Sequence, residues 1–279
     1  MTAREGQKRE CPEGERRWML VAGASQGIGR ATVRLLLKEG YSVVASARGV
    51  EPLEELAREY AGGKVGPELG PAHKDRLKIL PCDFAQIEKL QDYVSNVADL
   101  TGGISGMLYA AGMQKTLPLT QSKFPLAEEI FRVNTFAAFE LIRLFAKKGA
   151  YRPEGASFVL LSSMAAHEGA LGKALYGAAK GALEGFIPAA SAELVMKKIR
   201  MNGLVLGVVQ TGMSMQFIEK MSEDQKKALQ AEYPLGLGEP EDAAQFVAYL
   251  LSEKARWITG QTFTLDGGHS VRTTYSERM

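Results

Sequence analysis

Short apolar runs alternate with amphipathic stretches along nearly the whole chain, and this alternation limits the folds that are open to it. Seven runs are rich in β-branched or other apolar residues and have the character of buried strands: residues 18–22, 41–47, 77–82, 104–110, 157–162, 200–206 and 262–265. The stretches between them carry apolar residues at helical intervals of three and four. Such alternation is typical of a parallel sheet with helices on both faces. The predicted fold class is therefore α/β, a single doubly wound domain with a parallel seven-stranded sheet.

The predicted helices and the remaining segments divide the chain. Helices are expected over residues 28–39, 52–60, 87–100, 124–148, 174–197 and 241–252. Residues 61–76 have no apolar period and predict a surface loop, whereas residues 211–238 mix methionines with charges and predict a mobile flap. In this division residues 1–17 are a flexible leader, 18–268 the folded domain and 269–279 a C-terminal tail.

Composition argues against several classes of function. Of 279 residues 46% are hydrophobic, so the chain can bury a large core. Lysine and arginine (34) nearly balance aspartate and glutamate (32), which favours neither nucleic acid nor a membrane surface as a partner. Cys11 and Cys82 cannot form a disulfide framework, and no Cys/His cluster has zinc-ligand spacing, so no metal is expected. Without a signal-peptide pattern or an apolar run of membrane-spanning length, a cytoplasmic location is predicted.

A glycine-rich turn follows the first predicted strand and leads directly into a helical pattern. The segment reads Ala22-Gly23-Ala24-Ser25-Gln26-Gly27-Ile28-Gly29. Glycines at such a turn allow close approach of a pyrophosphate, and the following helix offers free N–H groups and the positive end of its dipole. A dinucleotide is the ligand expected of a Rossmann-type turn in this context, and the alternative is a plain strand-to-helix turn.

The glycine spacing G-x-x-x-G-x-G resembles that of the short-chain dehydrogenase/reductase family. In that family the active-site Tyr and Lys lie in Y-x-x-x-K, and the active-site Ser precedes the Tyr by thirteen residues; Ser163, Tyr176 and Lys180 have both spacings. Asn134 resembles the family's catalytic Asn. The resemblance covers residues 18–268 and includes Ile258-Thr259-Gly260-Gln261 and Asp266-Gly267-Gly268 near its end.

These four residues suit the reduction of a ketone, which leaves negative charge on the carbonyl oxygen and needs a proton donor beside it. Tyr176 is expected to supply the proton. Lys180 shares its helix face and should lower the tyrosine pKa, and the resemblance also places Lys180 on the nicotinamide ribose. Ser163 should hold the substrate oxygen, and the resemblance gives Asn134 a place in a water chain from Lys180 to solvent. Taken alone, they could instead be a Tyr packed on the sheet, a solvated helix Lys, a Ser that ends a strand and an amide that bonds backbone.

The end of the second predicted strand bears on the choice of cofactor. A carboxylate there would bond the adenosine ribose and repel a 2′-phosphate, but the chain has Ala47 followed by Arg48. Arg48 can pair with a 2′-phosphate, so NADP(H) is predicted in preference to NAD(H). The alternative for Arg48 is an exposed loop cation, and Gln26 stands where many NADP-binding relatives have a basic residue. The predicted cofactor-binding residues are Gly23, Ser25, Gln26, Gly27, Ile28, Gly29, Arg48, Asp83, Phe84, Ala111, Gly112, Tyr176, Lys180, Gly207, Val209 and Thr211.

The chain departs from the family pattern at several turns. Ala22 stands in place of the usual Thr, Tyr109 and Ala110 in place of two Asn, and Leu206 in place of Pro. In the family fold the first two of these segments lie close together. An apolar contact around Tyr109 is therefore expected in place of a hydrogen bond. Asp83 resembles the family residue that bonds adenine, and its alternative is a helix N-cap.

The resemblance implies an NADP(H)-dependent oxidoreductase that interconverts a ketone and a secondary alcohol, with the 3-oxoacyl-carrier-protein reductases as the most similar type. The alternatives are a sugar, steroid or small-alcohol dehydrogenase, a non-catalytic sensor of the NADP redox state and, less well matched, a nucleotide-sugar epimerase. The resemblance also implies a homotetramer or homodimer formed by the helices that begin near Phe124 and Ala174. No catalytic role is predicted for His73, His167 or His269.

Overall fold

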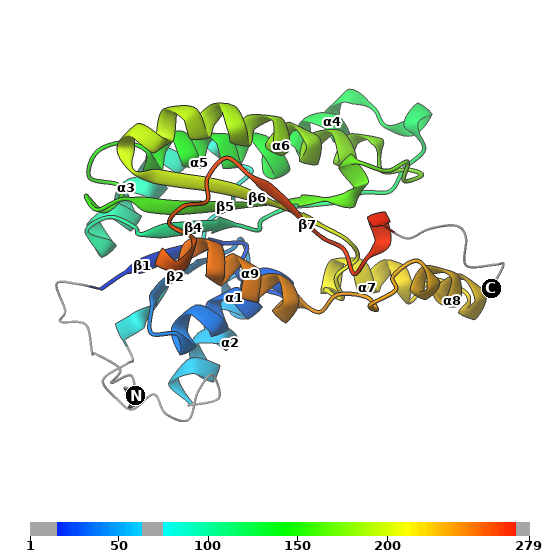
Figure 1. Cartoon of the computed structure of the whole chain (residues 1–279), viewed down its shortest axis with the longest axis horizontal. Coiled ribbons are helices and arrows are strands. Elements are labelled where there is room, and N and C mark those ends of the chain that lie inside the picture. Colours follow the sequence, from blue (N-terminus) through cyan, green and yellow to red (C-terminus); the bar gives the residue numbers. More distant parts are fainter. Residues whose placement is uncertain (1–15, 63–74, 272–279) are drawn as a thin grey trace, which may run out of the picture.

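Seven parallel strands form one sheet at the centre of the computed structural model, which describes residues 16–62 and 75–271 (Figure 1). Their order, β3-β2-β1-β4-β5-β6-β7, confirms the predicted fold class. Cys11, His73 and most of the predicted leader, 61–76 loop and tail lie outside the described residues. The strands are β1 (Trp18–Ala22), β2 (Ser42–Ser46), β3 (Leu77–Ile79), β4 (Gly106–Tyr109), β5 (Ala156–Ser163), β6 (Ile199–Leu206) and β7 (Thr262–Leu265).

Burial on both faces explains why these runs become strands. Every residue of β1 and β2 is buried, as a parallel sheet covered by helices on both sides requires. Strand β3 is shorter than the predicted 77–82 run. Even so, the amides of Leu80 and Cys82 donate to the carbonyls of Ala45 and Ala47, so the chain stays beside β2 up to the carboxyl edge of the sheet.

Two layers of helices cover the sheet (Figure 1). Leu20 of β1 packs in one core with Val97 and Leu183, whereas its neighbour Val21 packs in the other core with Val33. Successive side chains of a strand point to opposite faces, so one strand serves both cores. The first layer holds α3 (Leu90–Thr101), α4 (Phe124–Phe131), α5 (Ala137–Phe145) and α6 (Ala174–Leu194), and the second holds α1 (Gly27–Lys38), α2 (Val50–Ala61) and α9 (Pro240–Leu251).

The single helix predicted over residues 124–148 is wrong in one respect, because a π-helical turn at Arg132–Phe136 separates α4 from α5. Inside this turn the side-chain Nδ2 of Asn134 donates to the carbonyl of Ile130, and Thr135 Oγ1 donates to the carbonyl of Ala179 in α6. Single π turns inside helices are frequent at functional sites. Here the turn places a buried polar side chain close to the carboxyl end of β4.

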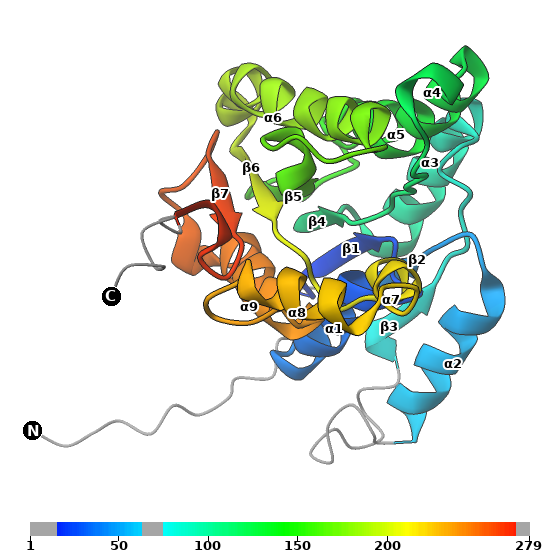
Figure 2. The same cartoon turned by 90° about the vertical axis from the view of Figure 1, so that its right-hand side faces the viewer.

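The segment predicted as a flap contains two helices, α7 (Gly212–Ile218) and α8 (Glu223–Ala231), which follow the carboxyl end of β6 (Figure 2). Ser222 caps α8: its Oγ accepts from the Gln225 amide, and its own amide donates to the Gln225 side chain. This reciprocal arrangement satisfies two backbone groups at the helix start. The mobility of the segment stays a prediction.

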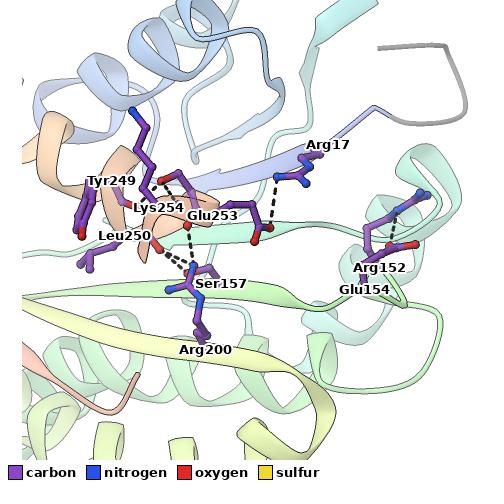
Figure 3. Close-up of polar contacts among 10 residues, drawn as sticks. Arg17, Arg152, Glu154, Ser157, Arg200, Tyr249, Leu250, Glu253 and Lys254 are labelled. Atoms are coloured by element: carbon purple, nitrogen blue, oxygen red, sulfur yellow. Dashed lines mark hydrogen bonds and ion pairs between the residues drawn. The ribbon is translucent and has the colours of Figure 1, made fainter. Parts of the chain in front are cut away.

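At the amino ends of the parallel strands, Arg200 of β6 forms hydrogen bonds with the carboxyl end of α9 (Figure 3). Its guanidinium donates to the carbonyls of Leu250 (2.9 Å), Ser252 (3.0 Å) and Ile258 (3.2 Å). The last carbonyls of a helix have no partner within the helix, so the partly buried guanidinium of Arg200 satisfies them well. Burial lowers the pKa of Arg200.

Arg200→Met should destabilise the fold by about 2 kcal/mol, because it removes hydrogen bonds from a charged donor. In a chain of this size that loss lowers the melting temperature by about 4–8 °C. Thermal unfolding followed by circular dichroism measures this. Arg17→Met is the matched control, because the Arg17–Glu253 ion pair (3.3 Å) is exposed and such pairs contribute about 0–1 kcal/mol (Figure 3). Equal shifts in the two variants would show that the carbonyl contacts do not stabilise the end of α9.

Candidate active site

A cavity of about 520 Å³ lies at the carboxyl ends of the strands. The strand order reverses there between β1 and β4, which is where open α/β sheets bind ligands. Every predicted cofactor-binding residue except Lys180 lies on the wall of this cavity, and so does Ser163. Lys180 and Asn134 are buried behind the wall. The structure thus gathers around one cavity residues that are far apart in the sequence.

The glycines after β1 leave no room for side chains. A Cβ on Gly23 would lie 2.5 Å from the amide nitrogen of Ala111, and one on Gly29 would lie 2.1 Å from the carbonyl oxygen of Gly23. Gly23 also has φ +95°, a conformation that favours glycine. The first turn of α1 carries no acidic residue, and its N-cap, Gln26, makes no side-chain cap. The backbone N–H groups at the start of α1 therefore fit the pyrophosphate of a dinucleotide.

Gly27 and Gly207 bring further segments to the same cavity. A Cβ on Gly27 would lie 2.9 Å from Thr211 Cγ2, so the starts of α1 and α7 touch. The Thr211 amide donates to Ser214 Oγ at 2.9 Å, so Thr211 occupies the N-cap position of α7. Gly207 lies against Asp266, and a Cβ on it would come within 2.9 Å of the Asp266 Cα.

Ser163 and Tyr176 face each other from the end of β5 and the first turn of α6. The Ser163 side chain lowers the pKa of Tyr176, which opposes the effect of burial on the tyrosine. Burial is the larger effect and raises the pKa of Tyr176 to about 12. The net pKa of Tyr176 is thus raised, and the expectation that Lys180 lowers it stays a prediction. A phenol with a raised pKa holds its proton at neutral pH and can donate it.

Lys180 lies on the same helix face as Tyr176, as predicted. Its Nζ is 5.7 Å from the centroid of the Tyr176 ring and donates to the carbonyl of Leu161 at 2.8 Å. Complete burial of the ammonium lowers its pKa to about 8. A group with a pKa near neutrality is typical of a site that moves protons.

Lys180→Met should change the dependence of stability on pH. The wild-type lysine has a pKa of about 8 when folded, against 10.5 as the ordinary value, so between these values only the unfolded chain holds the proton. The free energy of unfolding of the wild type should therefore rise, relative to the variant, by up to about 1.4 kcal/mol per pH unit from pH 8 upward. Urea denaturation at several pH values tests this, with Lys254→Met as an exposed control. A difference that stays constant with pH would contradict the burial of a charged Lys180.

Asn134 forms hydrogen bonds to the backbone, and its place in a water chain stays a prediction. Its Nδ2 donates to the carbonyls of Ile130 and Met113, both at 2.9 Å, and its Oδ1 accepts from the Met113 amide at 3.3 Å. A Cβ on Gly112 would lie 2.8 Å from Asn134 Oδ1 and 3.6 Å from Lys180 Nζ. The amide therefore fixes the chain after β4, and the space between Asn134 and Lys180 exists because residue 112 is glycine.

The expected replacement of a hydrogen bond by an apolar contact around Tyr109 is wrong. Its ring is fully buried and lies edge-on to Phe84 at 5.8 Å, but its hydroxyl donates to the carbonyl of Val133 in the π turn. Burial raises the pKa of this tyrosine. A hydrogen bond thus remains at this position, although it comes from an aromatic side chain. The predicted proximity of the two turns is confirmed by the contact between Gly23 and Ala111.

Arg48 and Asp83 lie where the chain leaves β2 and β3. Arg48 is exposed on the cavity wall, directly after the buried Ala47. The Asp83 carboxylate accepts from the Ala85 amide and from Gln86 Nε2, both at 3.1 Å. Asp83 therefore stabilises its own turn rather than capping the next helix, whose N-cap is Gln86, and it also lines the cavity.

Beyond Tyr176 the cavity has a wall that the sequence did not reveal. Glu168 and Lys173 line this wall. Both lie in the sequence between Ser163 and Tyr176, and that position could have indicated that they line the cavity. Tyr233 lines the same region and stacks on His269 at 4.8 Å between centroids. His269 was predicted to belong to the tail, but it is buried, so the packed chain continues past residue 268.

Two further searches cover only residues 16–62 and 75–271. No group of three or more His, Cys, Asp or Glu residues in these ranges could hold a metal ion. No helix in them is both long enough and apolar enough to cross a membrane.

Known proteins are similar to this chain in both sequence and fold. A family model described as enoyl-(acyl carrier protein) reductase matches residues 23–270. The 3-oxoacyl-[acyl-carrier-protein] reductase FabG of Rickettsia prowazekii is 32% identical over 250 residues, which cover 89% of this chain and 95% of that protein. Carbonyl reductase family member 4 of Xenopus laevis is 28% identical over 249 residues, with coverage of 89% and 95%.

Two solved structures show the same arrangement of elements. A short-chain dehydrogenase/reductase from Brucella melitensis, described as a glucose/ribitol dehydrogenase, has a TM-score of 0.80 at 28% identity, covering 91% of this chain and 96% of that chain. A variant actinorhodin polyketide ketoreductase crystallised with NADPH has a TM-score of 0.83 at 25% identity, with coverage of 92% and 98%.

Proposed function

This chain belongs to the short-chain dehydrogenase/reductase family of oxidoreductases, and we propose that it is an NADP(H)-dependent reductase that converts a ketone to a secondary alcohol. The observation that carries the proposal is that Ser163 and a half-buried Tyr176, which holds its proton at neutral pH, line one cavity that also contains a glycine cradle. The glycine cradle fits a dinucleotide pyrophosphate, and the side chains of Ser163 and Tyr176 line the same cavity. The bound nicotinamide cofactor supplies the hydride.

The residues of the chain divide the remaining work. Tyr176 donates its phenolic proton to the oxygen of the ketone, and Ser163 holds that oxygen by a hydrogen bond. Lys180, buried below the ring, supplies a positive charge that stabilises the phenolate left after proton transfer. Asn134 acts as a positioning residue, since its two hydrogen bonds to Met113 fix the segment after β4 that forms the cavity wall.

The preference for NADP(H) rests on Arg48. Its guanidinium is exposed on the cavity wall at the end of β2, and Ala47 leaves no carboxylate there to repel a 2′-phosphate. The structural relative crystallised with NADPH supports the same cofactor. Arg48 would hold the 2′-phosphate through charge-assisted hydrogen bonds.

The substrate proposed is a ketone of the 3-oxoacyl type. The FabG and ketoreductase names of the relatives support it, whereas the glucose/ribitol dehydrogenase name supports a sugar alcohol instead. A spectrophotometric assay of NADPH and NADH oxidation tests the proposal with an acetoacetyl thioester, a diketone, an aromatic ketone and a ketosugar. Turnover of the thioester with NADPH is the expected result. Turnover of the ketosugar alone would favour the sugar dehydrogenase, and tight cofactor binding without any turnover would favour a redox sensor.

A homodimer or homotetramer is proposed on family grounds. Phe124 at the start of α4 is 78% exposed and Phe136 is 45% exposed, and both lie on the elements expected at the interface. The cytoplasmic location stays a prediction.

A further inference from the structure

A carboxylate on α6 contacts the chain on both sides of Ser163. The side chain of Glu184 is mostly buried, with 16% of it exposed. Its Oε1 lies 2.5 Å from Ser162 Oγ, and its Oε2 lies 2.7 Å from His167 Nε2. Ser162 directly precedes Ser163, and His167 follows Ser163 by four residues. One carboxylate thus holds both ends of the segment that contains Ser163.

The same segment packs closely on α6 beside Tyr176. A Cβ on Gly177 would lie 2.3 Å from the carbonyl oxygen of Ala165, so only glycine permits this approach. A Cβ on Gly181 would lie 3.8 Å from the same segment, an ordinary contact distance. Positions 177, 181 and 184 share one face of the helix, since they are four and three residues apart. This face of α6 therefore contacts the segment at two glycines and binds it at Glu184.

Ser162 has one strong acceptor within reach. Its side chain is buried, and its hydroxyl lies 3.3 Å from the carbonyl oxygen of Lys180, a longer contact than the one to Glu184. A hydrogen bond to a carboxylate is about twice as strong as one between neutral groups. The bond to Glu184 therefore fixes the end of β5 on the helix that carries Tyr176 and Lys180. A shift of this strand end along α6 would change the separation of the Ser163 and Tyr176 side chains.

We propose that Glu184 is a positioning residue of the active site, which sets the separation of the Ser163 and Tyr176 side chains through its bonds to Ser162 and His167. The proposal rests on the reductase function proposed above and deepens it by naming residues that act through Ser163. In the described ranges 16–62 and 75–271 the cavity wall includes neither Glu184 nor His167. Their effect on the reaction passes through the groups that they hold.

Steady-state reduction of an acetoacetyl thioester by NADPH tests the proposal. Glu184→Ala should lower kcat by about tenfold to a hundredfold, since a misplacement of about 1 Å in an active site can cost about a hundredfold. The affinity for NADPH should be unchanged, because Glu184 lies outside the cavity wall. Glu184→Gln should keep most of the kcat, since the amide oxygen accepts from Ser162 and the amide nitrogen donates to a neutral imidazole at His167. Glu193→Ala, the control, removes an exposed carboxylate from the same helix and should leave kcat unchanged.

Ser162→Ala shows whether Glu184 acts through the serine. Two changes that break the same hydrogen bond are not additive, so the double variant Ser162→Ala/Glu184→Ala should have about the kcat of Glu184→Ala alone. Wild-type kcat in Ser162→Ala would overturn the proposal. A Glu184→Ala protein with a lowered melting temperature but wild-type kcat would also overturn it, because the contact would then be structural only. If Glu184→Ala does not fold, Ser162→Ala, which removes only a hydroxyl, carries the test.

Hydrogen–deuterium exchange tests the same bridge without turnover. The amides of Ala165, His167 and Glu168 are hydrogen-bonded within the segment. They should exchange about tenfold faster in Glu184→Ala than in the wild type or Glu193→Ala, because the segment then opens more readily. Unchanged exchange would refute the bridge, whatever the activity. Faster exchange in a protein whose wild type reduces no ketone would support the bridge and refute the reductase function, so the two failures are distinguishable.

Discussion

Tyr176→Phe should lower kcat for NADPH-dependent ketone reduction by about a thousandfold, because the variant lacks the proton donor and a positioned acid contributes about 10²–10⁴ in rate. The affinity for NADPH should change by less than about threefold, since the hydroxyl is a small part of a cavity of about 520 Å³. Steady-state kinetics together with fluorescence titration of NADPH measures both quantities. Loss of turnover with intact cofactor binding is the expected pattern.

The control for this variant is Tyr249→Phe, which removes a hydroxyl from α9 outside the cavity wall. That protein should keep its full activity. A Tyr176→Phe protein that retains more than about a tenth of the wild-type kcat would contradict the role of Tyr176, and proton transfer would have to be assigned to another group or to water.

Arg48→Ala should weaken NADPH binding by about tenfold to a hundredfold, because charge-assisted hydrogen bonds to a phosphate contribute about 1.5–3 kcal/mol. NADH lacks the 2′-phosphate, so its affinity should change less than about threefold. Arg48 is exposed, so its removal should leave the fold intact. Equilibrium titration of both cofactors at one fixed salt concentration measures the change, since salt screens exposed charges.

Arg58→Ala is the matched control for this second prediction, because it removes an arginine from the exposed side of α2 away from the cavity wall. It should leave both affinities unchanged. Equal weakening of NADPH and NADH in Arg48→Ala would show that Arg48 does not contact the 2′-phosphate. Selectivity would then have to come from another group, such as the Gln26 turn.

The sheet could be predicted from the sequence because burial on both faces of β1 and β2 demands continuous apolar runs. The glycine turn and the spacing from Ser163 to Tyr176 were equally readable, since each depends on local backbone geometry. The π turn was not, because nothing in its apolar period distinguishes it from an α-helix. It depends on tertiary hydrogen bonds such as that from Thr135 to Ala179.

The electrostatics of the site were also beyond the sequence. The spacing of Tyr176 and Lys180 predicted a lowered tyrosine pKa, but the complete burial of Lys180 and its bond to the Leu161 carbonyl could be seen only in three dimensions. The same holds for His269, whose contact with Glu168 joins residues 101 positions apart. Contacts of this range leave no local pattern in a single sequence.

The central claim is that this chain reduces a ketone by hydride transfer, and isotope transfer tests it most directly. NADPH that carries deuterium at C4 of the nicotinamide is incubated with the protein and with each ketone of the panel, and the alcohol is analysed by mass spectrometry. The account predicts one deuterium on the carbinol carbon of the product in the wild type and almost no product in Tyr176→Phe. Tight binding of NADPH with no labelled alcohol from any ketone of the panel, the acetoacetyl thioester included, would contradict the account and favour a protein that binds the cofactor without turnover.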